Sequence, residues 1–175
     1  MQKHFSISTE RLLLRPFTPT DLASLHEYAS DSENSKYMIH LPNTTLEQTQ
    51  QFLQCAIHEW EKDLPDFYEL AIVLAEKHIG AVSVYLDEQR RIGELGWVLN
   101  KAYHGNGYAT EAAFAIRNFS FDILKLKKLV AHCDYRNEAS CRIMQKIGMS
   151  QENDGVRKYK DTDDEIREFM YSLRI

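Results

Sequence analysis

The segment from Ala102 to Ala113, AYHGNGYATEAA, constrains the fold of this chain more than any other. It places Gly105 and Gly107 directly before a helix-like pattern of apolar residues. Glycine allows a sharp turn and a close approach of the backbone to a ligand. The first turn of a helix offers free N–H groups and a partial positive charge, which suit a phosphate group. The segment therefore predicts a loop and helix start that bind a pyrophosphate.

Two familiar phosphate-binding loops do not fit this segment. A Walker A loop ends in Gly-Lys-Ser/Thr, and no such triplet occurs in the chain. A dinucleotide-binding loop has a third glycine where this chain has Thr110, and it follows a strand directly, whereas the strand expected here ends near Leu99. The region where that motif needs an acidic residue, residues 125–128, is basic. Taken alone, the Gly-x-Gly pair is equally consistent with an ordinary loop before a helix.

Hydrophobic periodicity predicts an α+β chain with a mixed sheet. Helix signals begin at Thr18, at a capping box formed by Thr44 and Glu47 or by Thr45 and Gln48, at Gly107, and near Ala139. Short connections join the three strands between residues 68 and 99, which favours antiparallel pairing. We expect about four helices and a mostly antiparallel sheet of about seven strands, at residues 12–16, 68–74, 79–86, 92–99, 129–133, from 149 onward, and 166–173.

Composition narrows the functional class. A length of 175 residues suits one domain over residues 1–175, and 43% hydrophobic with 27% charged residues is typical of a globular protein in solution. The net charge of −5 argues against a nucleic-acid partner, which needs a basic stripe. The longest apolar run, residues 70–75, is too short to cross a membrane, and the N-terminus lacks the apolar stretch of a secretion signal. We expect a cytoplasmic protein without a membrane partner.

Metal and hydrolase chemistry are not expected. The three cysteines, Cys55, Cys133 and Cys141, show no Cys-x-x-Cys or zinc-type spacing, and the histidines show no metal-ligand spacing. The Gly-x-Ser-x-Gly motif of serine hydrolases is absent from the sequence. We expect reduced thiols and no metal site.

The longer string GYATEA, residues 107–112, resembles the acetyl-CoA-binding segment of the GNAT N-acetyltransferase superfamily. In that family's pattern, Arg/Gln-x-x-Gly-x-Gly/Ala, the small residues correspond to Gly107 and Ala109, and His104 departs from the usual Arg or Gln. Residues 93–99 resemble the family's fourth strand, and residues 137–149 resemble its second cofactor motif. The opening strand, residues 9–16, is similar to that of the ribosomal-protein N-terminal acetyltransferase subgroup, the RimJ/RimL type.

The resemblance implies a GNAT-type fold and acetyl-CoA as the acyl donor. It implies that backbone groups after the fourth strand bind the pyrophosphate, that a backbone N–H on that strand stabilises the oxyanion, and that an asparagine contacts the pantetheine arm. The cofactor-binding residues so implied are Trp97, Val98, Leu99, His104, Gly105, Asn106, Gly107, Tyr108, Ala109, Thr110 and Asn137. Asn137 is equally suited to cap a helix.

Two side chains are candidates for catalysis. Glu94 lies mid-strand among apolar neighbours, where partial burial would raise its pKa toward that of a useful base. It is equally suited to pair with Arg90, Arg91 or another cation. Glu111 is a rival base, although its place in the first helical turn favours an interaction with the helix dipole.

Ser140 is the second candidate, because it could hydrogen-bond the departing thiolate, although it could equally bond within its own helical turn. Many members of the superfamily carry a tyrosine acid where this chain has Met144, which has no proton to give.

These features predict an acetyl-CoA-dependent N-acetyltransferase. The expected acceptor is a primary amine, in particular the α-amine at the N-terminus of a peptide or protein. Two alternatives stay open: a small-molecule amine such as a polyamine, amino acid or aminoglycoside, and a non-catalytic acyl-CoA-binding module. A homodimer is possible, and the sequence does not identify the acceptor.

Overall fold

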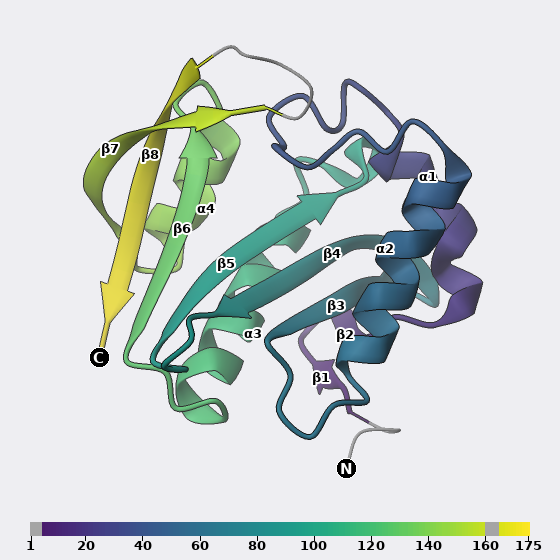
Figure 1. Cartoon of the computed structure of the whole chain (residues 1–175), viewed down its shortest axis with the longest axis horizontal. Helices are drawn as coiled ribbons and strands as arrows, with labels where there is room; N and C mark the ends of the chain where they lie inside the picture. Colours follow the sequence, from purple (N-terminus) through teal and green to yellow (C-terminus); the bar gives the residue numbers. More distant parts are fainter. Residues whose placement is uncertain (1–4, 160–164) are drawn as a thin grey trace.

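The computed structural model describes residues 5–159 and 165–175, and these form one eight-stranded sheet with α-helices on both faces (Figure 1). The strands are β1 (Ile7–Ser8), β2 (Leu12–Pro16), β3 (Phe67–Leu74), β4 (Lys77–Leu86), β5 (Ile92–Leu99), β6 (Lys128–Asp134), β7 (Ser150–Lys158) and β8 (Glu165–Arg174). The helices are α1 (Leu22–Ala29), α2 (Leu46–Glu59), α3 (Tyr108–Asp122) and α4 (Glu138–Lys146), with short 3-10 helices η1 (Pro19–Asp21) and η2 (Lys101–Tyr103).

The strand order is β1-β2-β3-β4-β5-β6-β8-β7, and every neighbouring pair is antiparallel except β5 and β6. Helix α3 connects these two parallel strands. The expected mixed, mostly antiparallel α+β fold is confirmed. The expected number of about seven strands was one too low, because β1 has two residues, which is too short to show an alternating pattern.

Each face of the sheet packs against its own pair of helices (Figure 1). On β5, Leu95 and Leu99 are buried in the same apolar cluster as Ile116 of α3 and Met144 of α4. The neighbouring Val98 packs on the other cluster, which contains residues of α1 and α2. The α3–α4 side carries most of the expected cofactor-binding side chains, so we call it the cofactor face and, for contrast, the α1–α2 side the acceptor face. The period-2 alternation of a strand directs neighbouring side chains of β5 to these opposite faces.

Local sequence explains where the helices begin. Thr45 caps α2 by accepting a hydrogen bond from Gln48 N (3.2 Å), which confirms the second of the two expected capping boxes. Gly107 precedes α3 with φ 80°, in the left-handed region. Ala112 and Ala113 are fully buried, so small side chains let this helix lie close to the sheet. The expected start of the first helix at Thr18 instead opens with η1, and α1 follows.

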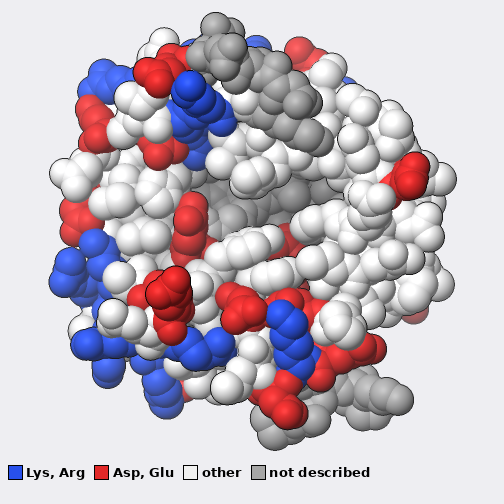
Figure 2. All heavy atoms as spheres, in the orientation of Figure 1, with Lys and Arg blue, Asp and Glu red and all other residues white. Residues whose placement is uncertain are grey.

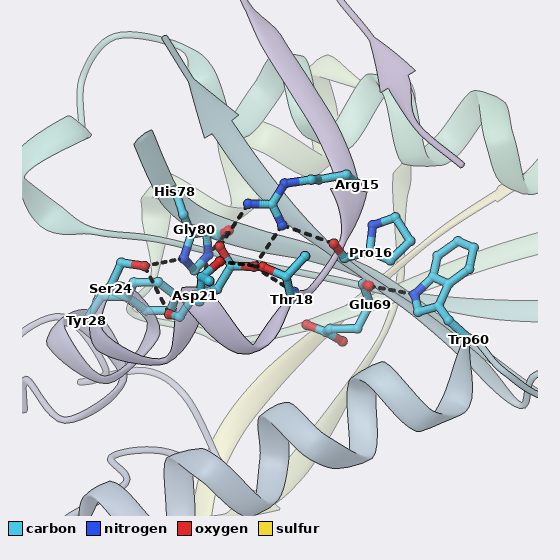
Figure 3. Close-up of polar contacts among 11 residues, drawn as sticks. Arg15, Pro16, Thr18, Asp21, Ser24, Tyr28, Trp60, Glu69, His78 and Gly80 are labelled. Carbon is cyan, nitrogen blue, oxygen red and sulfur yellow. Dashed lines mark hydrogen bonds and ion pairs between the residues drawn. The ribbon is translucent and has the colours of Figure 1, made fainter. Parts of the chain in front are cut away.

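Polar contacts hold η1 and α1 against the sheet (Figure 3). Arg15 on β2 forms two hydrogen bonds with the Asp21 carboxylate, of 2.7 and 2.8 Å. The imidazole of His78, on β4, contacts Ser24 Oγ of α1 (2.7 Å) and the carbonyl of Gly80 (2.9 Å). These partners satisfy buried polar groups and fix the side of the sheet that α1 covers.

Candidate active site

Strands β5 and β6 separate at the centre of the sheet (Figure 1). They pair only over Ile92–Glu94 and Lys128–Val130, so the rest of β5 has no partner on that side among the described residues. Asn100 N donates to Ile79 O of β4 (2.8 Å), and by alternation the N–H of Val98 also points toward β4. The N–H groups of Trp97 and Leu99 therefore point into the opening, and Val98 is the one predicted donor that faces away from it.

The loop after β5 has the shape that the glycine pair predicted. Gly105 and Gly107 both have φ of 80°, a conformation that favours glycine. A Cβ atom at Gly105 would meet nothing within 4 Å, so the backbone is open to a ligand there. Glu111 N donates to Gly107 O (3.0 Å), which leaves the N–H groups of the first helical residues, 108–110, without acceptors inside the helix. These features fit a diphosphate at the N-terminus of α3.

Two side chains, those of His104 and Asn106, stabilise the conformation of the loop through hydrogen bonds. The Nε2 atom of His104 contacts Leu99 O at 2.9 Å, which ties the loop to the end of β5. The amide nitrogen of Asn106 donates to the carbonyl of His104 (3.0 Å). His104, which stands in place of the family's usual Arg or Gln, therefore uses its ring in a hydrogen bond within the loop. The backbone of the loop is left to face a ligand.

A set of hydrogen bonds, which we call the clasp, joins residues 9–11 to α3, and no sequence pattern indicated it. Glu111 accepts hydrogen bonds from Thr9 Oγ1 (2.6 Å), Arg11 N (2.8 Å) and Arg11 Nε (2.7 Å). Arg11 also donates to Asn106 O (3.0 Å) and lies over the Tyr108 ring. Burial raises the pKa of Glu111, but these hydrogen bonds outweigh it and leave the pKa below its usual value. Glu111 is therefore engaged in structure, and no local pattern links residues 100 positions apart.

On the cofactor face, β5 and α4 meet at the opening. The indole Nε1 of Trp97 donates to Ser140 Oγ at 3.0 Å. Asn137 Oδ1 accepts from Ser140 N at 3.1 Å, so Asn137 caps α4. Met144, one turn further on, is buried in the core. Of these contacts, the cap was expected from the sequence and the indole–hydroxyl bond was not.

On the acceptor face, Glu94 forms a pair that the sequence did not indicate. Its Oε1 atom lies 3.0 Å from Nδ1 of His132 on β6, and the Glu94 side chain is 54% exposed. The hydrogen bond from His132 lowers the pKa of Glu94 below its usual value, and this outweighs the effect of partial burial. The expectation that burial would raise this pKa was wrong, because the carboxylate accepts a hydrogen bond from the imidazole and keeps contact with solvent. That partner is neither Arg90 nor Arg91.

The irregular segment of residues 30–43 contacts the chain at two places: just after the end of β5, and on strand β7. Lys101, just after β5, forms an ion pair with Asp31 at 2.5 Å. Arg157 of β7 forms an ion pair with Glu168 of β8 (2.7 Å) and donates to Tyr37 O (3.4 Å). Figure 2 shows that the surface of this face is hollowed over β5. Of the acidic stretch at residues 159–165, in which the sequence favours a polar turn, residues 160–164 lie outside the described residues.

Within residues 5–159 and 165–175, no three His, Cys, Asp or Glu side chains gather as they would around a metal ion. In the same part of the chain, no helix is long and apolar enough to cross a membrane.

Comparison with known proteins identifies the family. The family model described as an acetyltransferase (GNAT) domain matches residues 11–150. An uncharacterized N-acetyltransferase of Bacillus subtilis, YnaD, is 33% identical over 146 residues, 83% of each chain. Spermidine N(1)-acetyltransferase of Escherichia coli is 24% identical over 153 residues, covering 87% of this chain and 80% of its own.

A solved structure of RimL, a ribosomal L7/L12 alpha-N-protein acetyltransferase in complex with coenzyme A, matches with a TM-score of 0.86 at 16% identity over 98% of both chains. At that identity the match shows the fold alone, and the subgroup is not identified. The family model, the B. subtilis relative and the loop at the start of α3 together place the chain in one family: it belongs to the GNAT acetyltransferases.

Proposed function

We propose that this protein transfers the acetyl group of acetyl-CoA to a primary amine, and that the preferred acceptor is the α-amine at the N-terminus of a peptide or protein. The single observation that carries the proposal is the opening between β5 and β6. A loop whose backbone could bind a diphosphate lies on the cofactor face, and the Glu94–His132 pair lies on the acceptor face. An acyl group inserted there would be reachable from both sides of the sheet.

Acetyl-CoA is the acyl-donor substrate, as the family implies. The backbone N–H groups of residues 108–110 would hold its diphosphate, with Gly105 and Gly107 allowing the close approach. The pantetheine arm would then run along β5 toward Asn137. Positioning of this kind removes much of the entropic barrier to the reaction.

The opening offers two kinds of group for the acyl transfer itself, backbone N–H donors and a hydroxyl. The N–H groups of Trp97 and Leu99 point into it and would stabilise the oxyanion of the tetrahedral intermediate, a contribution on the order of 3 kcal/mol. Ser140 would assist the leaving thiolate. An indole N–H can only donate, so Ser140 Oγ must accept the bond from Trp97. The hydroxyl proton of Ser140 therefore stays available for donation to sulfur.

Resemblance and acidity both support an α-amine acceptor. Residues 9–16, Glu94 and Ser140 are similar to the ribosomal-protein-type subgroup, and RimL, named for α-N-protein acetylation, has the same fold. An α-amine has a pKa near 8 and a lysine amine one near 10, so more of the α-amine is neutral and nucleophilic at pH 7. A second candidate, a polyamine, is favoured by the relative named spermidine N(1)-acetyltransferase.

One panel of acceptors tests the proposal. Acetyl-CoA is incubated with a peptide that has a free N-terminus and an internal lysine, with the same peptide blocked at its N-terminus, and with spermidine, and products are identified by mass spectrometry. We expect acetylation of the free peptide alone. Equal acetylation of both peptides would contradict the α-amine preference, and rapid acetylation of spermidine alone would establish the second candidate. Acetylation of none of the three would contradict both candidate acceptors.

A further inference from the structure

We infer that His132 is the group that removes the proton from the acceptor amine, and that Glu94 acts by positioning and polarising the imidazole. The inference rests on the proposed function and names a catalytic residue for it. Glu94 becomes a positioning residue in this scheme.

The geometry places His132 at the point where the reaction would occur. The last paired residues of β5 and β6 are Glu94 and Val130, and His132 is the next residue of β6 on the same face. The Glu94–His132 hydrogen bond of 3.0 Å therefore bridges the two strands where they begin to separate. The His132 side chain keeps 23% of its surface exposed. Because Nδ1 is bound to Glu94, the opposite nitrogen, Nε2, is the one left for a substrate.

The surrounding charges support this division of roles. Besides Glu94 on β5, the charged or titratable groups that influence the pair are Glu168 on β8, Arg157 on β7 and His40 in the segment of residues 30–43. Arg157 and Glu168 form their own ion pair at 2.7 Å, with 9% and 17% of the side chains exposed, so they largely cancel. Glu94 is left as the dominant anion next to the imidazole.

The acidity of the two groups then favours the imidazole as the base. The hydrogen bond from Glu94 raises the pKa of His132 above its usual value, and that from His132 lowers the pKa of Glu94. A general base is most effective when its pKa lies near the working pH. A carboxylate with a lowered pKa is far from that range, whereas an imidazole with a raised pKa lies within or close to it.

The proton balance of the reaction is complete with these groups. Neutral His132 takes one proton from the ammonium group of the acceptor at Nε2, and Glu94 stabilises the resulting imidazolium. The neutral amine attacks the thioester carbonyl, a C–N bond forms, and the C–S bond breaks as the tetrahedral intermediate collapses. The second proton lost by nitrogen ends on the departing sulfur, to which Ser140 donates a hydrogen bond. His132 later releases its proton to solvent.

Two measurements test the inference. The first is an NMR titration of protein labelled with ¹³C-histidine, in which His132→Gln identifies the signal. The midpoint of His132 should lie above about 6.5, the usual value for histidine, and should fall in Glu94→Gln. An unshifted midpoint in Glu94→Gln would overturn the coupling.

The second measurement is the pH dependence of kcat/KM with the amine that the wild-type protein acetylates. His132→Gln should lower kcat/KM at pH 7.5 by about 10²–10⁴-fold and remove the acidic limb, with thermal stabilisation by acetyl-CoA unchanged. Glu94→Gln should keep an acidic limb and move it to lower pH.

The matched control is His58→Gln, on α2, where the side chain is 77% exposed and pairs with Glu61. This variant should keep both the wild-type rate and the acidic limb of the pH profile. Wild-type rates in His132→Gln, or loss of the limb in His58→Gln, would overturn the inference. A wild-type protein that acetylates no amine would instead overturn the proposed function.

Discussion

The two faces of the sheet differ in how their halves of the site are assembled. The cofactor face takes its groups from one continuous stretch, β5 through α4, residues 92–146. The acceptor face combines side chains from β3 to β8 with the segment of residues 30–43. On the first face the binding groups are mostly backbone N–H donors. On the second they are side chains that acquire their properties from partners distant in sequence.

The difference has a physical reason. A diphosphate is the same in every acetyl-CoA, and a helix start with two glycines binds it with backbone geometry that a short segment can encode. An acceptor site must discriminate among amines, which requires placed side chains with adjusted acidities. Short-range sequence patterns therefore describe the cofactor half far better than the acceptor half. If the two halves are independent, a substitution in one half should leave the function of the other half unchanged.

The largest effect is expected at Gly107. Gly107→Val forces a β-branched residue into the left-handed region, and its Cβ would lie 3.5 Å from the Arg11 guanidinium, so the loop proposed to bind the diphosphate would have to change shape. We expect affinity for acetyl-CoA to fall by more than about 100-fold, so the stabilisation of about 2.7 kcal/mol expected for wild type with ligand at about 100 times Kd would largely disappear. Thermal unfolding with and without acetyl-CoA measures this effect.

The matched control is Gly148→Val, at the end of α4. Gly148 has φ 91°, and its added Cβ would meet nothing closer than 3.9 Å, so the backbone strain is similar but remote from the loop. This variant should lose comparable stability and keep the response to acetyl-CoA. A normal response in Gly107→Val would show that the loop is not the diphosphate site.

A smaller effect is expected from Glu69, which lies on the acceptor face and is 7% exposed. Tyr85 donates to its carboxylate (3.1 Å), and Trp60 donates to its carbonyl (2.9 Å), a contact drawn in Figure 3. Burial raises the pKa of Glu69 from 4.5 to about 7. Because the folded state holds this proton more tightly than the unfolded state, the stabilisation is full below about pH 4.5 and is lost as pH rises through about 7.

Glu69→Gln removes that dependence. We expect the variant to gain roughly 2.5 kcal/mol of stability relative to wild type between pH 5 and pH 8, because the wild-type carboxyl loses its proton over this range and the amide has none to lose. Urea unfolding at both pH values measures the change, with the exposed Glu88→Gln as the control that should show none. An equal difference from wild type at both pH values would mean that the carboxyl is already ionised at pH 5.

The smallest effect is expected from Ser140→Ala on the cofactor face. Losing the hydroxyl that assists the thiolate should lower kcat about 10-fold, which corresponds to about 1.4 kcal/mol, with KM for acetyl-CoA little changed. Trp97→Phe removes the indole donor but keeps the hydroxyl, so its effect on kcat should be smaller. If Trp97→Phe lowers kcat as much as Ser140→Ala, the serine acts only as part of the packing between β5 and α4.

The sequence by itself determined the parts of this protein that depend on neighbours along the chain. Alternating and helical periodicities predicted the α+β order, since each reflects how one element buries one face. The capping box at Thr45 and the two left-handed glycines were predictable because a cap or a turn involves only a few consecutive residues. The two-residue β1 was missed because it is too short for a pattern.

Only the tertiary structure decided the parts that depend on residues far apart in the chain. The clasp from Thr9 and Arg11 to Glu111 spans about 100 positions, and the Glu94–His132 pair spans 38. The sequence pointed to Glu94 as a base whose burial would raise its pKa, but the fold brought a histidine to it and lowered that pKa instead. The acidity of a side chain depends on the charges and solvent around it in space, and periodicity along the chain does not encode them.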